Sequence, residues 1–454
     1  MQIIQISYRT LSSHRGGKRL YMQGLKLAVA GYAVGSRYQI TEDYESNSLI
    51  LNPSESGSLK VSRKKVGAVI YPVIDLCSQK LMDFLGAEIT RVCVTISLNA
   101  IKISLHPVDL SIKDRMRRLY QKILLEQPLA MGSLCHGGGI LDHALHSGLT
   151  DEGVNTQLSW LIEMNEVYIQ SSLNNNSTVD ENTLIVNGTL EEIDTEYLSV
   201  IDLLVAGLPC TGASKAGKSS NKIKHAEQHQ SAGTAFLGFL DIIKQTKPAV
   251  VLLENVLDYQ NSLSFLLITE RLKQWGYDIH TMELDRSLGA FEDRKRLCMV
   301  AVTRGLQFNC NLLPSREPEK NLSEMLESID SDSSLWKDCT YIDDKAERDL
   351  VAGKGFKTQL VKADCEKVGV IGRGYAKYRS TEPMIQHPTK LKKRRLLTPV
   401  EHARVKSIPE SLVDGLSATI AHQILGQSVL HSAFVSVGRL LGAHLQKVKV
   451  KATT

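Results

Sequence analysis

From residue 128 onward, short apolar runs alternate with helical stretches, and this alternation constrains the fold more than any other feature. The runs are MGSLC, QLSWLIEM, TLIV, IDLLVAGLP, AVVLLENV and RLCMVAV. They lack the polar alternation of a strand with one face in water, so we expect both faces to be covered. Buried strands separated by helices predict an α/β domain with a parallel sheet. Such sheets bind ligands at the carboxyl ends of their strands.

Length and composition favour a globular protein of several domains. The 454 residues predict two to four domains at roughly 100–200 residues each. No apolar run reaches the ~18 residues that cross a bilayer, and the first 17 residues lack the apolar core of a signal peptide. The eight cysteines form no CxxC or Cys/His cluster. We therefore expect a cytoplasmic protein with reduced thiols and with neither a membrane span nor a metal.

The net charge of +5 is unevenly distributed along the chain. Residues 1–125 contain 18 Lys and Arg against 9 Asp and Glu, and residues 351–398 contain 12 against 3. Residues 316–350 are acidic, with 5 basic and 11 acidic residues. Two basic zones are consistent with binding to a polyanion such as nucleic acid. The alternative is a pair of solvated charged faces.

The first 125 residues form a distinct basic α+β module. A strand–helix–hairpin pattern occurs in residues 19–40 and 46–52 and recurs in residues 73–105. The repeat resembles the swapped-hairpin domains of AbrB-type transition-state regulators, which bind DNA as dimers, so two copies in one chain would form a pseudo-dimer. A small basic scaffold domain is the alternative. A basic helix predicted over 109–127 links this module to the rest of the chain.

Three predicted strand ends carry reactive or charged groups. Cys210 follows IDLLVAGLP and precedes a basic loop, which makes it a candidate nucleophile, although a lone cysteine is more often buried and inert. Glu254 and Asn255 end AVVLLENV, where a carboxylate either faces a cleft or is a solvated strand end. Arg294 and Arg296 are predicted on one side of an extended segment. There they would bind a phosphate or a carboxylate, or form a solvated patch.

In this order, LPC, ENV, RxR, RRLLTPVEHARV and GQSV resemble the motifs of the DNA (cytosine-5)-methyltransferase family over residues 130–445. The resemblance implies a Rossmann-like S-adenosylmethionine-dependent domain over 128–304 and 396–447. It also implies a smaller target-recognition domain over 305–395, and it leaves the N-terminal module, residues 1–125, unexplained.

The resemblance implies a role for each matching residue. Cys210 corresponds to the nucleophile that adds to C6 of a cytosine flipped out of duplex DNA, and Glu254 to the acid that engages N3. Asn255, Arg294 and Arg296 correspond to residues that hold the base, the glutamate and the loop. The family's closing loop corresponds here to Ser214, Ala216 and Gly217, and the residues of this loop expected to contact DNA are Ser214, Lys215 and Lys218.

The implied cofactor is S-adenosyl-L-methionine. The residues expected to line its site are Leu134, Gly138, Gly139, Glu163, Met164, Pro209, Gln427 and Ser428. Glu163 corresponds to the acid that holds the ribose hydroxyls. Four positions depart from the family pattern: His136 replaces a glycine, Thr189 an aspartate, Glu292 a glutamine and Gln427 an asparagine.

The expected partner is double-stranded DNA, and a cognate restriction endonuclease is a further candidate partner. The segment expected to read the target mixes basic, aromatic and small polar residues: Arg373, Tyr375, Lys377, Tyr378, Arg379 and Ser380, followed by the run KLKKRR (390–395). Two alternatives remain open at this stage. One is an RNA cytosine-5 methyltransferase, and the other is a catalytically silent DNA-binding regulator that acts through its basic N-terminal module.

Overall fold

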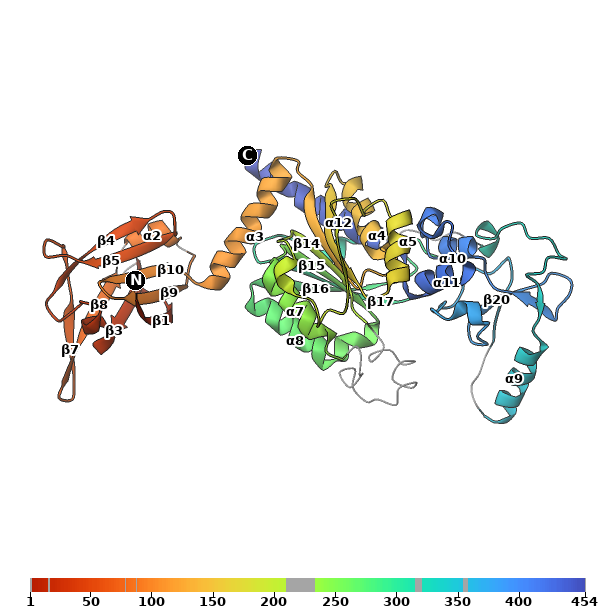
Figure 1. Ribbon diagram of the computed structural model, residues 1–454, viewed down its shortest axis with the longest axis horizontal. Helices are drawn as coiled ribbons and strands as arrows, with labels where there is room; N and C mark the ends of the chain where they lie inside the picture. Colours follow the sequence, from red (N-terminus) through yellow and green to blue (C-terminus); the bar gives the residue numbers. More distant parts are fainter. Residues whose placement is uncertain are drawn as a thin grey trace. The chain divides into compact units, whose positions relative to one another are not determined.

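The computed structural model describes residues 2–14, 17–77, 79–86, 88–209, 233–314, 321–353 and 358–453. The chain divides into two compact units, Met1–Asp114 (unit 1) and Arg115–Thr454 (unit 2). Figure 1 shows the elements of each unit in sequence colours.

Unit 1 is built mainly from antiparallel strands. Its elements are β1 (Ile3–Thr10), β2 (Ser12–His14), β3 (Gly17–Gln23), α1 (Leu25–Val29), β4 (Arg37–Asp43), β5 (Ser48–Pro53), β6 (Leu59–Lys60), β7 (Ser62–Val66), β8 (Val69–Cys77), α2 (Gln79–Leu85), β9 (Arg91–Ser97) and β10 (Ala100–Leu105). A six-stranded sheet has the order β1-β9-β10-β5-β4-β6, and a four-stranded sheet, which we call the hairpin sheet, has the order β2-β3-β8-β7. The strand–helix–hairpin pattern occurs twice, as β3-α1-β4-β5 and as β8-α2-β9-β10.

Helix α3 (Pro107–Leu124) crosses the boundary between the units. Arg115 is 2% exposed, and its guanidinium donates to Thr303 Oγ1 at 3.0 Å and to the Trp275 carbonyl at 2.9 Å. Leu119 and Ile123 belong to the hydrophobic core of unit 2. The later part of α3 is thus part of unit 2. The boundary between the units falls between Asp114 and Arg115, whereas the sequence had suggested a boundary at residue 125.

Unit 2 contains the α/β sheet that the apolar runs predict. Its first elements are β11 (Leu129–Leu134), α4 (Ile140–Asp151), β12 (Thr156–Glu163), α5 (Glu166–Asn175), β13 (Leu184–Asn187), β14 (Leu203–Gly207), α7 (Ala235–Thr246), β15 (Val250–Asn255), α8 (Leu263–Gln274), β16 (Tyr277–Leu284) and β17 (Arg296–Thr303). The sheet has the order β13-β12-β11-β14-β15-β17-β16. All pairings are parallel except those of β17, which is antiparallel to both β15 and β16.

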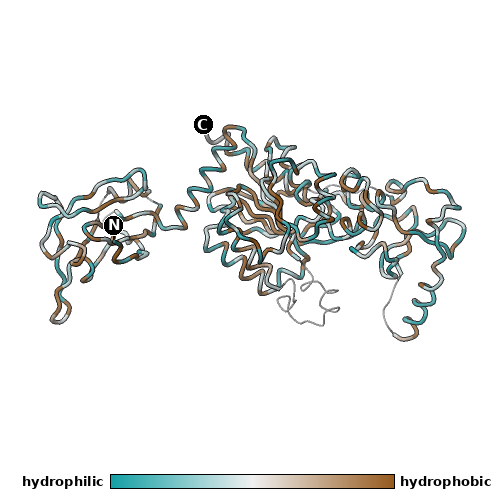
Figure 2. The backbone as a smooth tube through the Cα atoms, in the orientation of Figure 1, coloured by the Kyte–Doolittle hydropathy of each residue, from teal (hydrophilic) through white to brown (hydrophobic). Residues whose placement is uncertain are grey.

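Alternate residues of each strand face different layers of this sheet. Leu203 and Val205 of β14 pack in the core with α4 and α12 (His431–Thr453), whereas Leu204 and Ala206 pack in the core with α7 and α8. Figure 2 shows the strands of this sheet as strongly hydrophobic. A parallel sheet covered on both faces is the doubly wound, Rossmann-like arrangement, so the predicted α/β fold class is confirmed.

The remaining elements follow β17. They are β18 (Lys337–Asp338), α9 (Thr340–Val351), β19 (Gln359–Val361), β20 (Pro383–Gln386), β21 (Lys393–Arg395), α10 (Pro399–Val405), α11 (Ala418–Gln427) and α12. The short strands form a second sheet in the order β18-β21-β20-β19. Among the described residues no single helix has the length and apolar character of a membrane span, although α11 and α12 pass that test as a bent pair.

Candidate active site

The strand order of the large sheet brings several polar strand ends to one edge. The chain runs from β11 outward to β13 and then returns to β14 on the other side of β11. Ligands of such sheets bind at this switch point, beyond the carboxyl ends of the strands. The loop after β11, Glu163 at the end of β12, Pro209 after β14 and Glu254 at the end of β15 all lie at this edge.

Glu254 is paired with Arg296 across neighbouring strands. Because β17 runs antiparallel to β15, its first residue lies beside the last residues of β15, and Asn255 is in register with Leu297. Arg296 Nε is 2.9 Å from Glu254 Oε1. Burial raises the pKa of the Glu254 carboxyl, and Arg296 opposes this shift. The carboxyl is therefore held in place by a cation while its protonated form is favoured by burial.

Asn255 ties the end of β15 to the turn after β14. Its side chain is 1% exposed, and its Nδ2 donates to the Leu208 carbonyl at 3.2 Å. Its Oδ1 accepts from the Val256 amide at 2.8 Å. Leu208 and Pro209 directly precede Cys210 in the sequence, so Asn255 fixes the backbone from which the predicted nucleophile follows.

Arg294 is held by direct contacts of its own. It precedes β17, is 2% exposed, and donates to Glu292 Oε1 at 3.0 Å and to the carbonyls of Ile371 and Gly426 at 2.7 and 2.9 Å. Arg294 thus links the strand entry to two distant segments of unit 2. The charges of both arginines lower the pKa of Glu254 against the effect of burial, and their placement on one side of an extended segment stays a prediction.

The departure at Glu292 is accompanied by a buried lysine that the sequence analysis missed. Lys406 is fully buried, and its Nζ lies 3.3 Å from Glu292 Oε2. It also donates to the carbonyls of Leu425 and Ser428 at 2.6 and 3.0 Å. Burial lowers the pKa of Lys406 to about 7, although Glu292 opposes this shift. The only sequence signal was a lysine directly after the apolar face of EHARV.

The predicted cofactor loop follows β11 and turns sharply. Gly139 has a φ of 73°, and a Cβ there would lie 2.1 Å from Asn176 Nδ2, so only glycine fits. A Cβ on Gly138 would lie 2.6 Å from Ile424 of α11. The amide of Gly137, which the sequence analysis did not select, donates to Glu163 Oε2 at 2.7 Å.

Glu163 ends β12 and is nearly buried, at 8% exposed. Its Oε1 accepts from the Asn165 amide at 2.8 Å, while its Oε2 accepts from the loop. Two backbone donors therefore orient this carboxylate at the carboxyl edge of the sheet, and each oxygen keeps a further lone pair for a ligand.

His136, which replaces a glycine, is held by its own partners. Its Nδ1 lies against the Asp142 carboxylate, and its Nε2 is 2.7 Å from Ser172 Oγ. The imidazole therefore connects the loop to helices α4 and α5. Thr189 is half-buried and donates to Glu192 Oε2 at 2.8 Å.

The other predicted cofactor residues differ in exposure. Leu134 is buried at the end of β11, Met164 is 69% exposed, Gln427 is exposed at the end of α11, and Ser428 is half-buried beside Lys406. Pro209 is exposed. Cys210 lies outside the described residues, as do the predicted loop residues Ser214, Lys215, Ala216, Gly217 and Lys218.

One predicted DNA contact is corrected by the structure. Tyr375 is fully buried, its hydroxyl donates to the Pro383 carbonyl at 2.7 Å, and it accepts from the Leu397 amide at 2.9 Å. Its flanking glycines suggested a surface loop, but the ring packs edge-on against two histidines. Lys377 and Arg379 are exposed.

Other basic residues of the predicted recognition segment also have internal partners. Arg373 is exposed and lies over the Tyr168 ring at 5.7 Å. Arg394 and Arg395 end the basic run but are only 2% and 3% exposed, and they pair with Asp343 and Glu401. Both arginines of the run are therefore structural and do not face solvent.

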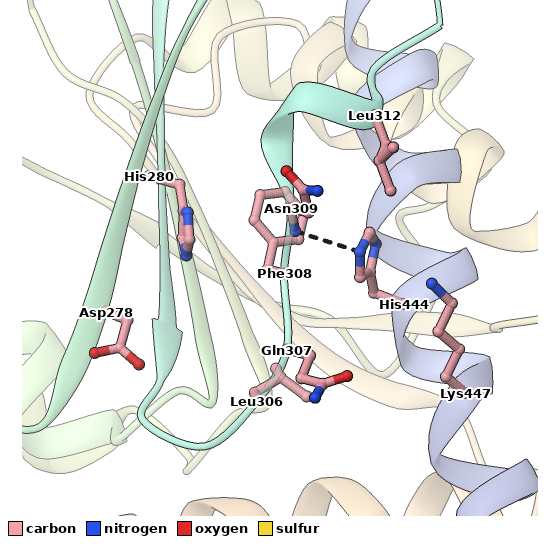
Figure 3. A pocket seen from close by; sticks show the side chains of 9 residues that line it. All are labelled: Asp278, His280, Leu306, Gln307, Phe308, Asn309, Leu312, His444 and Lys447. Carbon is pink, nitrogen blue, oxygen red and sulfur yellow. Dashed lines mark hydrogen bonds between the residues drawn. The ribbon is translucent and has the colours of Figure 1, made fainter.

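A separate pocket lies on another part of unit 2. Figure 3 shows Phe308 between His280 of β16 and His444 of α12, with Asp278 and Lys447 at its margin. The Phe308 ring contacts both imidazoles, with ring centroids 5.2 and 5.4 Å apart. None of the predicted site residues lines this pocket. Among the described residues no cluster of His, Cys, Asp or Glu has the form of a metal site.

Comparison with known proteins agrees with this geometry. Residues 129–442 match the model of the family described as C-5 cytosine-specific DNA methylase. The type II methyltransferase M1.ScrFI of Lactococcus lactis subsp. cremoris is 28% identical over 58% of this chain and 68% of its own length. The type II methyltransferase M.NlaX of Neisseria lactamica is also 28% identical, over 58% of this chain and 83% of its own length.

Solved structures show the same fold. The Dnmt2 methyltransferase of S. pombe superposes with a TM-score of 0.55 at 18% identity, covering 70% of this chain and 99% of that one. The methyltransferase EhMeth of Entamoeba histolytica gives 0.53 at 19% identity, covering 69% and 98%. With the family model matched over most of its length, the chain belongs to the C-5 cytosine-specific DNA methylase family and is a DNA cytosine methyltransferase.

Proposed function

We propose that the chain methylates C5 of a flipped-out cytosine within a specific duplex DNA sequence, through a covalent bond between Cys210 and C6. The observation that carries this proposal is the Glu254–Arg296 pair at 2.9 Å, at the carboxyl edge of the sheet. Glu254 also lies close to Gly207, the last residue of β14: a Cβ built on this glycine would be 3.8 Å from Glu254 Oε2. An acid with a raised pKa thus lies beside the strand end that leads to Cys210.

The residues then act in sequence. The Cys210 thiolate forms an S–C6 bond, and the electron pair of the C5–C6 double bond moves through the ring as Glu254 gives its proton to N3. S-adenosyl-L-methionine, when bound, would supply the methyl group that C5 accepts and would leave as S-adenosyl-L-homocysteine. A base, which solvent can supply, removes the C5 proton. The N3 proton returns to the Glu254 carboxylate, and the Cys210 sulfur leaves C6 as the C5–C6 double bond reforms. Arg296 keeps the Glu254 carboxylate in place after it has given up its proton.

The loop and strand end that would hold the cofactor fit it chemically. Gly138 and Gly139 let the loop lie close against Ile424 and Asn176, since a Cβ at either position would clash with these side chains. Glu163 presents an oriented carboxylate to ribose hydroxyls, which are hydrogen-bond donors. The further predicted contacts are Leu134, Met164, Pro209, Gln427 and Ser428, from the strand ends and from α11.

Within unit 2, we assign catalysis to 128–304 with 396–447, and target recognition to 305–395. The relatives are type II methyltransferases. We extend the proposal to a cytoplasmic restriction–modification role, in which the product protects DNA from a cognate endonuclease.

The test is a covalent trap. Purified protein is incubated with S-adenosyl-L-methionine and with long mixed-sequence duplexes in which every cytosine is 5-fluorocytosine. Fluorine at C5 cannot leave as a proton does, so the enzyme should remain bound through C6. We expect a denaturation-resistant adduct that depends on the cofactor and is absent in Cys210→Ala.

Two controls distinguish the alternatives. Cys298→Ala replaces a buried cysteine of β17 and should retain the adduct. The same assay with 5-fluorocytosine RNA should give none, and an adduct with RNA alone would replace duplex DNA as the substrate. If DNA binds but no adduct forms on any duplex, the proposed enzyme would be replaced by a silent DNA-binding regulator.

A further inference from the structure

Unit 1 has an internal two-fold arrangement that its strand pairings reveal. The first half runs β1-β2-β3-α1-β4-β5, and the second half runs β6-β7-β8-α2-β9-β10. When corresponding elements are exchanged, the order β1-β9-β10-β5-β4-β6 becomes its own reverse, and so does the order β2-β3-β8-β7. Both sheets are therefore built around one local dyad.

The registers agree with this dyad at the level of single residues. Leu20 and Met22 of β3 correspond to Ile74 and Leu76 of β8, and all four are buried. The Leu11 amide donates to the Thr90 carbonyl at 2.8 Å, and its counterpart, the Val61 amide, donates to the Ser36 carbonyl at 2.9 Å. The axis passes through the opposed pairs Tyr21–Asp75 and Ile50–Lys102.

Two hairpins extend from this axis in opposite directions. Because β3 and β8 are antiparallel, the pairs His14–Gly17 and Val66–Val69, which are the outermost pairs of the β2–β3 and β7–β8 ribbons, lie at opposite ends of the hairpin sheet. Figure 1 shows the β7–β8 hairpin projecting from the rest of unit 1. All five residues of β7 are exposed, so the projecting ribbon is open to solvent on both faces.

Both hairpins carry basic charge in segments that have no acidic residue. Residues 1–41 contain six Lys and Arg and no Asp or Glu, and residues 56–74 contain four and none; Lys18 and Arg19 lie on β3, and Arg63, Lys64 and Lys65 lie on β7. Arg63, Lys64 and Lys65 form the middle of β7. Within the described part of the chain, no carboxylate pairs with any of the three. Exposed basic side chains commonly lack partners. Because successive side chains of a strand alternate, Lys64 lies on one face of the projecting ribbon and Arg63 and Lys65 lie on the other, so both faces of the ribbon are positive.

The centre of the hairpin sheet continues the face that carries Lys64. Arg19 lies over the Tyr21 ring at 5.6 Å and Lys64 lies over it at 5.7 Å. Asp75 pairs with Arg19 at 2.6 Å and so neutralises one cation at the axis. The positive charge that remains is on the two arms, on either side of a polar and aromatic centre.

We propose that the hairpin sheet of unit 1 is a second DNA-binding surface, which binds duplex DNA with its local dyad aligned to a dyad of the duplex. A two-stranded ribbon fits the major groove, and Lys and Arg contact the flanking phosphates. Because duplex DNA has two-fold axes between its strands, two arms related by a dyad meet equivalent backbones. The arms differ in sequence, so the two half-sites are unequal, and the β7–β8 arm makes the larger contribution.

The first experiment measures binding of the full chain to an all-A·T duplex, which contains no cytosine and so no methylation target. Fluorescence anisotropy is recorded across a salt series for the native chain and for R63A/K64A/K65A. Each phosphate contact contributes about 0.9 to the salt slope. We expect the triple variant to lower the slope by about 2 to 3 and to bind roughly ten-fold or more weakly at ~0.1 M salt.

The matched control is K60A/R91A/K102A. It removes the same charge from unit 1, but from the six-stranded sheet. Tyr38, Val92 and Ile101, which lie next to these three residues in the sheet, are buried. Since neighbouring side chains alternate between the two faces, Lys60, Arg91 and Lys102 are on the outward face. An equal loss in both variants, or no loss in R63A/K64A/K65A, would overturn the proposal. Stronger binding of the native chain to single-stranded RNA or to anionic phosphatidylserine vesicles than to duplex DNA would overturn it too.

The symmetry is tested by selecting duplexes from a random pool with the full chain. The native chain should enrich an imperfect inverted repeat, and R63A/K64A/K65A should lose preference in one half only. Enrichment of sites with no inverted repeat would refute the dyad. Both triple variants should still form the Cys210 adduct, so a failure of this inference is distinguishable from a failure of the proposed reaction.

Discussion

The ion pair between Glu254 and Arg296 is set by backbone geometry. Two antiparallel strands bring these side chains together, and the ladder from Val250–Val302 to Asn255–Leu297 fixes their register. Arg296 is the first residue of β17, which lies beside the end of β15. Its side chain therefore reaches Glu254 while its backbone stays paired in the sheet. The acid is thereby positioned before any substrate binds, and less conformational entropy is lost when it reacts.

Glu254→Gln should reduce the rate of methylation by about 10²–10⁴-fold, because the amide keeps the shape of the side chain but cannot give a proton to N3. Single-turnover methyl incorporation on genomic DNA measures the rate, and anisotropy should show nearly unchanged DNA affinity. Glu283→Gln changes an exposed carboxylate of β16 and should behave as the native chain. Turnover unchanged in Glu254→Gln would remove this residue from the acid role.

Glu292 and Lys406 form a buried ion pair at 3.3 Å. Lys406→Met should destabilise unit 2 by about 3–5 kcal/mol, because it leaves a buried carboxylate with one cation fewer. Adding Glu292→Gln should recover most of that loss. Urea unfolding of both single variants and the double variant gives the coupling, and Lys295→Met, which alters an exposed lysine, is the control. Additive losses would show that the two groups are not coupled.

Sequence reasoning reached the strand-end residues but not their supports. Glu254 and Asn255 stood out because a polar pair ended an apolar strand. Lys406 and Glu292 are separated by more than a hundred residues, and only tertiary packing joins them. Tyr375 was assigned to a surface because its neighbours are small and basic, whereas its ring fills the core between α10 and α11.

At the scale of elements, helices α4 and α12 cross at two glycines. A Cβ on Gly148 would lie 2.1 Å from the Val435 carbonyl, and a Cβ on Gly438 would lie 2.7 Å from the Leu145 carbonyl. These backbone contacts cannot give way as a flexible side chain can. The two helices therefore approach each other so closely because both lack side chains at the crossing.

Gly148→Val should destabilise unit 2 by at least about 1–3 kcal/mol, since the helices must separate to admit the side chain. The thermal midpoint should fall by roughly 2–4 °C for each kcal/mol lost. Gly188→Ala is the control, because a Cβ there has nothing within 4 Å. A midpoint for Gly148→Val equal to that of the control would contradict the close crossing.

Helices α10 and α11 are joined by His402 and His422, whose Nδ1 atoms lie 3.0 Å apart. Burial lowers the pKa of both imidazoles, that of His422 to about 4. The unfolded chain thus binds more protons than the folded chain between about pH 6.5 and pH 4. The stability that these neutral rings contribute is fully present above about pH 6.5 and is lost as the pH falls towards 4.

We therefore expect the free energy of unfolding of the full chain, measured with urea, to fall as the pH is lowered from about 6.5 to about 4. His422→Phe should remove the share of one imidazole from this change in stability, on the order of 3 kcal/mol between pH 6.5 and pH 4. His14→Phe replaces an exposed histidine of β2 and should leave the slope unchanged. A slope that His422→Phe does not alter would mean that this ring is not buried as a neutral imidazole.

At the scale of the molecule, the division inside α3 decides which truncations fold. Removing residues 1–110 retains Arg115, Leu119 and Ile123, which unit 2 buries. That variant should remain soluble and keep basal methylation of genomic DNA. Removing 1–125 takes these side chains away and should lower the thermal midpoint or prevent soluble expression. Loss of folding in the 1–110 deletion would instead make unit 1 necessary for unit 2.

The sequence predicted the parallel sheet and the repeated module because apolar periodicity and turn residues are local properties. It did not predict that β17 enters between β15 and β16, because strand order depends on which edges pack together. It also placed the boundary after the linking helix, since the periodicity of α3 gives no indication of which core it joins.

The duplicated halves of unit 1 have an evolutionary consequence. In a dimer of identical chains, every mutation appears on both sides of the axis, so a gain on one arm is also imposed on the other. Two halves encoded in tandem escape this constraint. Here β7 carries Ser-Arg-Lys-Lys-Val while its counterpart β2 carries Ser-Ser-His. One half can therefore change its surface residues while the other half preserves the fold of unit 1. Single substitutions can then make the chain favour DNA sites whose two halves differ.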